Sequence, residues 1–497
     1  MPAALLSKLP LPDSFESGYL EFNGILPLEL ADDHLRVAVA GEPAVEVLDD
    51  LEVSFGVALE LVPVSRDELL DGIRRAYAAA ESVVELVRDL DAEAGGRTEG
   101  GDATVADARD LANQPPVIRF VNLLIREAYE ARASDIHLES SREGLRARFR
   151  LDGVLVDVPS PPKGLQAAVV SRVKLLAELD IAERRQPQDG RIRVRLEERE
   201  LDLRVATVPT LYGESVVLRL LDRGGRPVAL EELGMPPELL EQFRRLAARP
   251  HGMLLATGPT GSGKTTTLYA ALALRNAREE KIITVEDPVE YHLEAVTQVP
   301  VHVKAGMTFA AALRSLLRQD PDVLMVGEMR DAETAAIAVQ AAMTGHLVFS
   351  TLHTNDAASA ITRLADLHVE PYLIAATLEG VLAQRLVRKI CPECRERYHP
   401  DPQAAALLAH QPVGNITLER GRGCAACRDT GYRGRTGLFE LLLITDELKQ
   451  AIARLEPLAQ LRSLARGEGM STLRQDGWRK VQAGITTVEE VLRVTDT

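Results

Sequence analysis

The sequence predicts an α/β protein whose central domain is a parallel sheet with a phosphate-binding loop, and three observations support this fold class. Residues 258–265 match the pattern G-x-x-x-x-G-K-[ST] and lie between an apolar run and a helix-like segment. Three later apolar runs end in polar residues, as expected of parallel strands whose carboxyl ends share one edge of a sheet. The four cysteines form two C-x-x-C pairs, which indicates a small metal-binding subdomain.

The chain is long enough for several domains. Because a single core stops growing near ~250 to 300 residues, a chain of 497 residues is expected to hold about three domains or more. Composition shifts along the chain place the boundaries. We expect an N-terminal α+β domain at 1–92, a flexible linker at 93–114, a second α+β domain at 115–228, the α/β domain with the phosphate loop at 229–385, a tetracysteine zinc-binding subdomain at 386–440 and a C-terminal helical subdomain at 441–497. This last subdomain is expected to pack against the rest without adding chemistry.

Charge is distributed unevenly along the chain. The formal net charge is -16, and residues 1–112 carry 24 acidic and 8 basic side chains, whereas the remainder carries 50 of each sign. A nucleic-acid motor needs a basic surface, so this balance argues against direct nucleic-acid binding. The acidic N-terminal part is expected to meet a different partner. No apolar run approaches the roughly 18 residues that span a bilayer, and we see no signal-peptide pattern. We therefore expect a cytoplasmic protein that reaches a membrane through partners.

Short strand-like runs predict the first N-terminal domain, and a change in composition predicts the linker after it. Runs at 35–40 and 59–64, followed by a helix-like segment at 78–90, fit a small α+β domain. The stretch that begins at Asp91 is low in hydrophobicity and lacks periodicity, so it has the composition of a linker.

The second domain is expected to begin with a helix at 117–132 and to continue in strands. Two of these strands, at 202–209 and 214–221, place Arg204 and Arg219 in otherwise apolar runs. An unpaired charge is costly in such a position. Either a carboxylate or a phosphate is therefore expected to meet each guanidinium.

The phosphate loop predicts how a nucleotide is held. Its glycines let successive backbone N–H groups surround the β-phosphate, and the helix that follows favours anions at its N-terminus. Lys264 is expected to reach the β- and γ-phosphates, and the Thr265 hydroxyl is expected to bind Mg²⁺. The predicted nucleotide contacts are Gly258, Pro259, Thr260, Gly261, Ser262, Gly263, Lys264 and Thr265.

Three strands beyond the loop are expected to direct polar side chains at the same nucleotide. Glu286, Glu328 and His353 lie at their carboxyl ends. Glu328 is the candidate for polarising the attacking water, and the alternative is an acid that caps the next helix. Gly327 stands where magnesium sites of this kind commonly have aspartate, so Mg²⁺ would depend on Thr265 and on water held by Glu286 or Glu328. His353 is either a sensor of the γ-phosphate or a structural histidine.

Cys391, Cys394, Cys424 and Cys427 suit tetrahedral Zn²⁺, because each C-x-x-C pair supplies two thiolates from one tight turn. The 29 residues between the pairs exceed the usual ribbon spacing and predict an excursion of the chain. A redox dithiol is the alternative, but two pairs with no spare cysteine favour a metal. With no open ligand position indicated, the zinc is expected to be structural.

Four motifs together resemble the secretion ATPases of the type II system and of type IV pilus assembly. They are similar to that family's Walker A motif, Asp box, Walker B motif and His box, and the resemblance extends from about residue 115 to the end of the chain. The motifs are Gly-Pro-Thr-Gly-Ser-Gly-Lys-Thr at 258, Thr-Val-Glu-Asp-Pro-Val-Glu at 284, Arg-Gln-Asp-Pro-Asp-Val-Leu-Met-Val-Gly-Glu-Met-Arg-Asp at 318 and Thr-Gly-His-Leu-Val-Phe-Ser-Thr-Leu-His-Thr-Asn at 344. The tetracysteine segment is similar to the assembly and secretion branch of the family.

The resemblance implies a RecA-like ATPase that forms a homohexamer on the cytoplasmic face of the inner membrane. Hydrolysis of ATP, with Mg²⁺, would drive pseudopilus assembly and protein export. The resemblance also implies that Arg204 and Arg219 close onto the γ-phosphate. We expect the N-terminal domain to bind an inner-membrane platform protein of the secretion system, which would make the membrane association peripheral.

Other functions are kept as alternatives. A type IV pilus assembly ATPase is the nearest one, and the short single N-terminal module favours type II secretion over it. A nucleic-acid translocase would share the motor fold but would be stimulated by DNA. A scaffold that binds ATP without hydrolysing it is the last alternative, and Glu328 argues against it.

Overall fold

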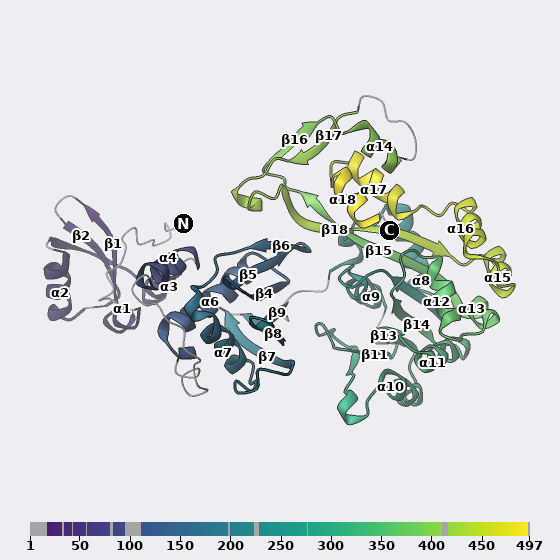
Figure 1. Cartoon of the computed structure of the whole chain (residues 1–497), viewed down its shortest axis with the longest axis horizontal. Helices are drawn as coiled ribbons and strands as arrows, with labels where there is room; N and C mark the ends of the chain where they lie inside the picture. The colour runs from purple at the N-terminus through teal and green to yellow at the C-terminus, as the bar shows by residue number, and fades with distance from the viewer. Residues whose placement is uncertain are drawn as a thin grey trace. The chain divides into compact units, whose positions relative to one another are not determined.

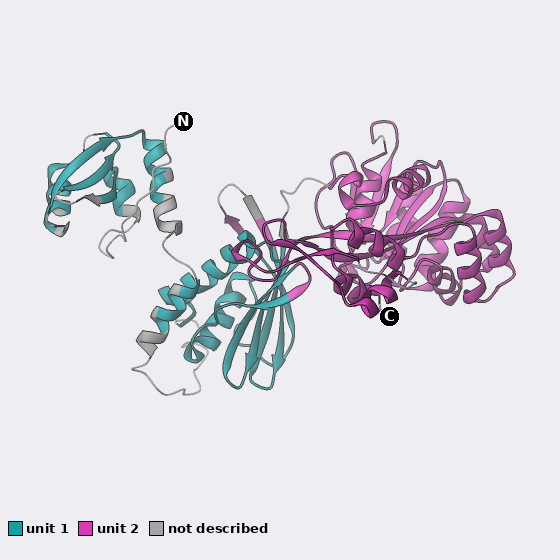
Figure 2. Cartoon of the chain, turned by 90° about the horizontal axis from the view of Figure 1, so that it is seen from above, with its two compact units in different colours: residues 1–151, 155–193, 203–220 teal, residues 152–154, 194–202, 221–497 magenta. Residues whose placement is uncertain are grey.

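The computed structural model describes most of the chain. The described residues are 17–31, 34–41, 43–55, 57–79, 83–94, 111–196, 199–222, 228–275, 277–409 and 416–495. They form two compact units, drawn in different colours in Figure 2. The first unit comprises residues 1–151, 155–193 and 203–220, and the second comprises 152–154, 194–202 and 221–497. Among the described residues no helix is long and apolar enough to cross a membrane.

The N-terminal domain is a three-stranded sheet packed against helices (Figure 1). The strand order is β1-β2-β3, with β1 antiparallel and β3 parallel to β2. Its elements are α1 (Ser17–Asn23), β1 (Ile25–Ala31), β2 (His34–Val39), α2 (Val45–Phe55), β3 (Ala58–Pro63) and α3 (Arg66–Ala79). Buried residues such as Leu35, Val37 and Leu51 form its core. The alternation of apolar residues thus produces a small α+β fold, as predicted.

The helix predicted at 78–90 corresponds mainly to α4 (Val83–Ala94). This helix packs against α6 (Pro115–Glu130) of the second domain. The backbone N–H of Val83 donates to Glu127 Oε1 at 2.7 Å. Helix α4 precedes the expected linker and packs on α6, the first helix after it. Most of the linker itself lies outside the described residues.

The second domain is a six-stranded sheet in the order β6-β5-β4-β9-β8-β7, accompanied by α6 and α7. In β5 the buried residues Leu145, Ala147 and Phe149 alternate with arginines, because successive side chains of a strand point to opposite faces. Its further elements are β4 (Asp135–Ser141), β5 (Gly144–Leu151), β6 (Val154–Asp157), α7 (Gln166–Leu176), β7 (Gln188–Leu196), β8 (Arg199–Thr210) and β9 (Gly213–Asp222).

The third domain contains a seven-stranded sheet in the order β12-β11-β13-β14-β10-β15-β18. All neighbouring strands are parallel except β18, which pairs antiparallel with β15. The strands are β10 (Gly252–Thr257), β11 (Ile282–Glu286), β12 (Thr297–Pro300), β13 (Val323–Val326), β14 (Leu347–Leu352), β15 (Leu378–Ile390) and β18 (Tyr432–Leu443). Four of them, β10, β11, β13 and β14, are buried at every residue, as expected where helices cover both faces. The mixed α/β fold predicted from the sequence is confirmed.

Helices cover this sheet on both faces, so that two apolar clusters form. One cluster includes residues of α8 and α9 packed on Leu254 and Phe349, and the other includes residues of α10 to α13 packed on Leu255 and Val348. The helices are α8 (Pro237–Ala247), α9 (Lys264–Leu272), α10 (Phe309–Leu316), α11 (Ala332–Met343), α12 (Ser359–Asp366) and α13 (Pro371–Thr377).

The tetracysteine segment is an insertion between β15 and β18 of the same sheet. It consists of β16 (Arg395–Tyr398), α14 (Pro402–Ala409) and β17 (Leu418–Gly421), with β16 and β17 antiparallel. Both boundaries expected for this segment, at 385/386 and at 440/441, fall inside strands of the large sheet. Four helices follow it: α15 (Asp446–Ala453), α16 (Leu458–Gly467), α17 (Leu473–Gln482) and α18 (Val488–Thr495).

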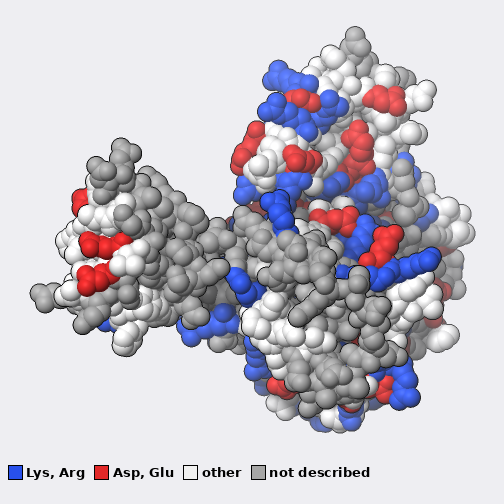
Figure 3. All heavy atoms as spheres, turned by 60° about the vertical axis from the view of Figure 1, so that its left-hand side comes forward, with Lys and Arg blue, Asp and Glu red and all other residues white. Residues whose placement is uncertain are grey.

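The chain after residue 112 carries equal numbers of acidic and basic side chains, but basic side chains outnumber acidic ones on the surface of β16 and β17. Basic side chains gather over β16 and β17 at the top of Figure 3, where Arg395, Arg397, Arg420 and Arg422 are exposed. Arg395 and Arg420 are paired with Glu419 and Glu396.

Candidate functional site

The phosphate loop connects β10 to α9, as the sequence predicts. Gly258, Gly261 and Gly263 have φ values of 149°, 77° and 87°, a region that favours glycine. A Cβ atom on Gly258 would lie 2.4 Å from the carbonyl oxygen of Gln384 in β15. The loop therefore needs glycine both for its backbone turns and for its close approach to the neighbouring strand.

Lys264 is the first residue of α9 and is buried beneath the loop. Its Nζ donates to the carbonyl oxygens of Gly258 and Pro259 at 2.7 and 3.1 Å. Burial lowers the pKa of Lys264 to about 8, while the nearby Glu328 carboxylate acts in the opposite direction. The ammonium group is thus held by two carbonyl dipoles.

Glu328 follows β13 and is the strand-end acid that lies close to Lys264. Its side chain is 13% exposed, with Oε1 2.7 Å from an Nη atom of Arg330 and Oε2 3.5 Å from Nε2 of His353. Burial and the charge of Lys264 lower the pKa of His353 from its ordinary value, and Glu328 opposes this shift. His353 is therefore mostly neutral at pH 7. The structure brings together Lys264, Glu328 and His353, three of the predicted site residues.

Glu286 occupies a different environment at the end of β11. It is 2% exposed and accepts hydrogen bonds from the hydroxyls of Tyr269 and Thr284 and from Nε2 of Gln298. Tyr269 belongs to α9, so this carboxylate ties the phosphate-loop helix to two neighbouring strands. A carboxylate that is buried and bound on both oxygens is suited to positioning the helix. Its direct contact with a nucleotide remains a prediction.

Gly327 explains why an acid is missing at the usual magnesium position. A Cβ atom there would lie 3.3 Å from the carbonyl oxygen of Val285 and 3.4 Å from Cα of Glu286. The first distance is slightly tighter than ordinary van der Waals contact, and the second lies at its lower limit. The close approach of β13 to β11 thus disfavours a longer side chain at residue 327.

The second domain carries the two predicted arginines on adjacent strands. Arg219 of β9 lies directly opposite Asp135 of β4, and its Nε donates to Asp135 Oδ1 at 2.9 Å. Asp135 is also 3.7 Å from Arg150, which lies opposite it on β5. Arg204 is half-buried on β8. In this structure a carboxylate meets Arg219, and the Arg219 side chain remains 57% exposed.

Sequence reasoning missed two polar residues of β15 beside the loop. Gln384 accepts a hydrogen bond from Thr267 of α9 at 2.7 Å, and its amide lies against Gly263. Arg385 is 5% exposed and donates to the carbonyl oxygen of Asn355 at 2.9 Å. Both lie in a long strand whose sequence shows no motif. Their only signal was polarity in an otherwise apolar run.

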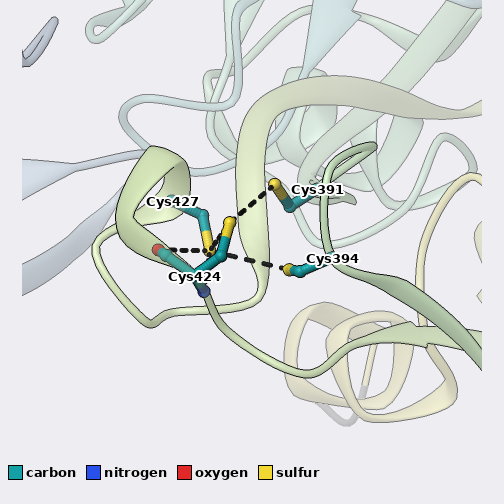
Figure 4. Close-up of side chains that lie close together, drawn as sticks. All are labelled: Cys391, Cys394, Cys424 and Cys427. Carbon is teal, nitrogen blue, oxygen red and sulfur yellow. Dashed lines mark hydrogen bonds between the residues drawn. The ribbon is translucent and has the colours of Figure 1, made fainter.

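The four cysteines form one cluster, shown in Figure 4. The sulfur atoms of Cys391 and Cys424 are 3.9 Å apart, those of Cys394 and Cys427 are 3.8 Å apart, and those of Cys424 and Cys427 are 3.7 Å apart. Tetrahedral Zn²⁺ with Zn–S bonds of about 2.3 Å requires sulfur separations of about 3.8 Å. The donor set and its spacing therefore fit zinc.

The environment of the cluster affects its thiols differently: it favours the thiolate of Cys427 and disfavours that of Cys394. Burial opposes ionisation of Cys427, but backbone N–H groups of Cys424 and Gly431 donate to its sulfur and lower its pKa to about 7. Burial raises the pKa of Cys394 to about 12. Such a thiol ionises on binding a cation, which is the usual behaviour of a metal-bound cysteine.

Comparisons with known proteins show which family the chain resembles. The family model described as type II/IV secretion system protein matches residues 110–493, and the MshEN domain model matches residues 1–83. The chain is 48% identical to the type II secretion system protein E of Xanthomonas campestris, over 98% of this chain and 86% of that protein. It is 43% identical to the type IV pilus assembly ATPase PilB of Myxococcus xanthus, over 94% of this chain and 83% of that protein. The crystal structure of the pilus retraction motor PilT with bound ADP matches 75% of this chain and 96% of its own, with 28% identity and a TM-score of 0.51.

Proposed function

This chain belongs to the type II/IV secretion system protein family, and from that premise we propose that it is the ATPase that powers a type II secretion system. Similarity to a type II protein E over nearly the whole chain supports this assignment. The pilus assembly ATPase is somewhat less similar and supports the alternative of pilus assembly only secondarily. We also propose a homohexamer that meets an inner-membrane platform protein through its N-terminal domain.

The proposal that the protein hydrolyses ATP rests on the position of Glu328 beside the buried Lys264. Lys264 would bind the β- and γ-phosphates in place of its present carbonyl partners. Arg330 holds one oxygen of Glu328, and the other oxygen, 3.5 Å from Nε2 of His353, would accept a proton from the attacking water. His353, neutral and next to that oxygen, would orient the same water or the γ-phosphate.

Mg²⁺ would be held by Thr265 and by water, because residue 327 carries no carboxylate. When bound, the cation neutralises charge that develops on the phosphate oxygens. Thr265 is half-buried at the start of α9, one residue after Lys264. Its hydroxyl is the ligand that the chain itself supplies.

Arg204 and Arg219 are proposed to complete the site from the second domain. For Arg219 this requires an exchange of partner, from the Asp135 carboxylate to the γ-phosphate. Asp135 would keep Arg150 as a partner, since the two lie on adjacent strands. Such an exchange links the presence of ATP to movement of the second domain.

The decisive test compares Glu328→Gln with Lys264→Ala. Glu328→Gln keeps the size of the side chain but removes the proton acceptor, so turnover should fall by about 10² to 10⁴ while ATP still binds. Lys264→Ala should weaken ATP binding itself. Release of phosphate and binding of a fluorescent ATP analogue are measured on both. Normal turnover by Glu328→Gln would remove this residue from the mechanism, and stimulation by DNA would favour a translocase.

A further inference from the structure

The loop that begins at His353 is contacted by several elements around the nucleotide site. Residues 353–357 follow β14, and the chain then enters α12. His353 lies against Glu328, as described above. The next residue, Thr354, forms hydrogen bonds with the hydroxyl of Thr257 through its own hydroxyl at 2.7 Å and through its backbone N–H at 2.9 Å. The loop is therefore fixed at its start to the strand that leads into the phosphate loop.

The rest of the loop is held by charged side chains from outside the phosphate site. Asp356 forms an ion pair of 2.5 Å with Arg462 of α16, and the same guanidinium donates to Ser359 Oγ. The backbone N–H of Ala357 donates to Glu440 of β18 at 2.9 Å. Glu440 also accepts from the backbone N–H of Leu473, the first residue of α17, at 3.3 Å. Helix α16 thus contacts the loop that carries His353 directly, and α17 is linked to it through Glu440.

Packing alone does not hold this loop. A cavity of about 570 Å³ borders it and is lined by Asn355, Asp356, Arg385 and Glu440, together with residues of α17 and α18. An open cavity gives the loop room to shift, because no side chains fill the space on that side. Arg385 and Glu440 are each 5% exposed, so their contacts with the loop are well shielded from water.

We propose that Arg462 of α16 is a positioning residue for ATP hydrolysis, which acts through its ion pair with Asp356. This inference rests on the proposed ATPase function and deepens it. Arg462 touches neither Glu328 nor the phosphate loop among the contacts described. It holds Asp356, three residues after His353, and thereby fixes where the imidazole lies relative to Glu328. The C-terminal helices, which the sequence suggested were only packing elements, then set the rate of the chemical step.

The test uses Arg462→Gln in the full-length protein. A small displacement of a catalytic group is expensive in rate, so kcat should fall roughly 10- to 100-fold. KM and the affinity for a fluorescent ATP analogue should stay within about threefold, because the phosphate loop is untouched. Arg462→Lys keeps the charge and should recover much of the lost rate. Arg454→Gln is the matched control, because Arg454 is exposed and its side chain donates, within the described part of the chain, only to Gln450 of α15.

A double-mutant cycle identifies the route. Asp356→Asn keeps the hydrogen bond from the backbone N–H of Ser359 to Oδ1, but it removes the charge that Arg462 meets. The double variant Asp356→Asn, Arg462→Gln should be no slower than the slower single variant, because both remove the same interaction. Asp356→Asn also serves as the test if Arg462→Gln does not fold.

Three outcomes would overturn the proposal. They are wild-type kcat in Arg462→Gln, a parallel loss of nucleotide affinity and melting temperature, and additive losses in the double variant. Wild type and Glu328→Gln are assayed beside these variants. If the wild type hydrolyses ATP and Glu328→Gln does not, a normal Arg462→Gln refutes the role of Arg462 alone. If the wild type hydrolyses nothing, the proposed function itself fails.

Discussion

The affinity for ATP should fall as pH rises through about 8, because Lys264 loses its proton in the free protein. Burial lowers the pKa of this lysine to about 8, and its present partners are two carbonyl oxygens. A bound triphosphate would stabilise the ammonium form and raise this pKa again. The protonated fraction of the free protein falls from about nine-tenths at pH 7 to about one-tenth at pH 9. The dissociation constant should therefore increase about tenfold, which corresponds to about 1.4 kcal/mol of binding free energy.

Binding of a fluorescent ATP analogue between pH 7 and 9.5 measures this effect. His353 does not titrate in that window, since burial and the charge of Lys264 lower its pKa from an ordinary value of about 6.5. Lys264→Ala provides the control, because its weak residual affinity should not change with pH in the same interval. A wild-type affinity that stays constant up to pH 9.5 would show that the ammonium group keeps its ordinary pKa. The buried position of Lys264 against the carbonyl oxygens of Gly258 and Pro259 would then not describe the free protein.

Three further predictions concern the other sites. Cys391→Ser should reduce bound zinc below one ion per chain and lower the melting temperature, because structural zinc contributes on the order of 10 kcal/mol in small domains; full zinc content by metal analysis would contradict the cluster. The double variant Arg204→Ala, Arg219→Ala should lose about 10³ or more in turnover but keep ATP binding, and activity restored by mixing Arg204→Ala with Lys264→Ala subunits would show that the arginines act across a subunit interface. Removal of residues 1–79 should leave hydrolysis intact but abolish membrane association in cells. This truncation keeps α4, in which the backbone N–H of Val83 donates to Glu127 of α6. A truncated protein that still fractionates with the membrane would refute the recruitment role of the N-terminal domain.

The parts of the site that the sequence predicted best are those in which local pattern and chemistry coincide. The phosphate loop needs glycines at fixed positions followed by lysine, so its eight residues specify their own conformation. The cysteine pairs are similar, since each C-x-x-C turn places two sulfur atoms close together without help from the rest of the fold. Apolar runs that end in an acid likewise predict carboxylates at the carboxyl edge of the sheet. They do not predict which carboxylate faces the nucleotide, as the different environments of Glu286 and Glu328 show. Which acid faces Lys264 depends on the strand order and on the helix that covers each strand.

Contacts between distant segments were invisible in the sequence for a related reason. Arg219 meets Asp135 because β4 and β9 are adjacent and in register, and these residues are separated by most of the second domain. Gln384 and Arg385 lie beside the phosphate loop because β15 is the neighbour of β10. Nothing in a single sequence states which strands are neighbours. A polar residue in an apolar strand indicates that a polar partner lies nearby, but only the pairing and register of the strands identify that partner.

The arrangement of β15 and β18 gives the zinc cluster a mechanical role that the boundaries expected from sequence had obscured. β15 begins inside the large sheet, passes Gln384 and Arg385 beside the phosphate loop and ends one residue before Cys391. β18 begins five residues after Cys427 and runs antiparallel along nearly the whole of β15. Helices α17 and α18 pack on these two strands, and the backbone N–H of Ile390 donates to the carbonyl oxygen of Ile485 at 2.9 Å. A cation held by the four thiolates would close the far end of this pair, where the chain makes an excursion of 29 residues. Bound zinc would therefore restrict the same strand that supports the phosphate loop, and we expect its removal to loosen the nucleotide site.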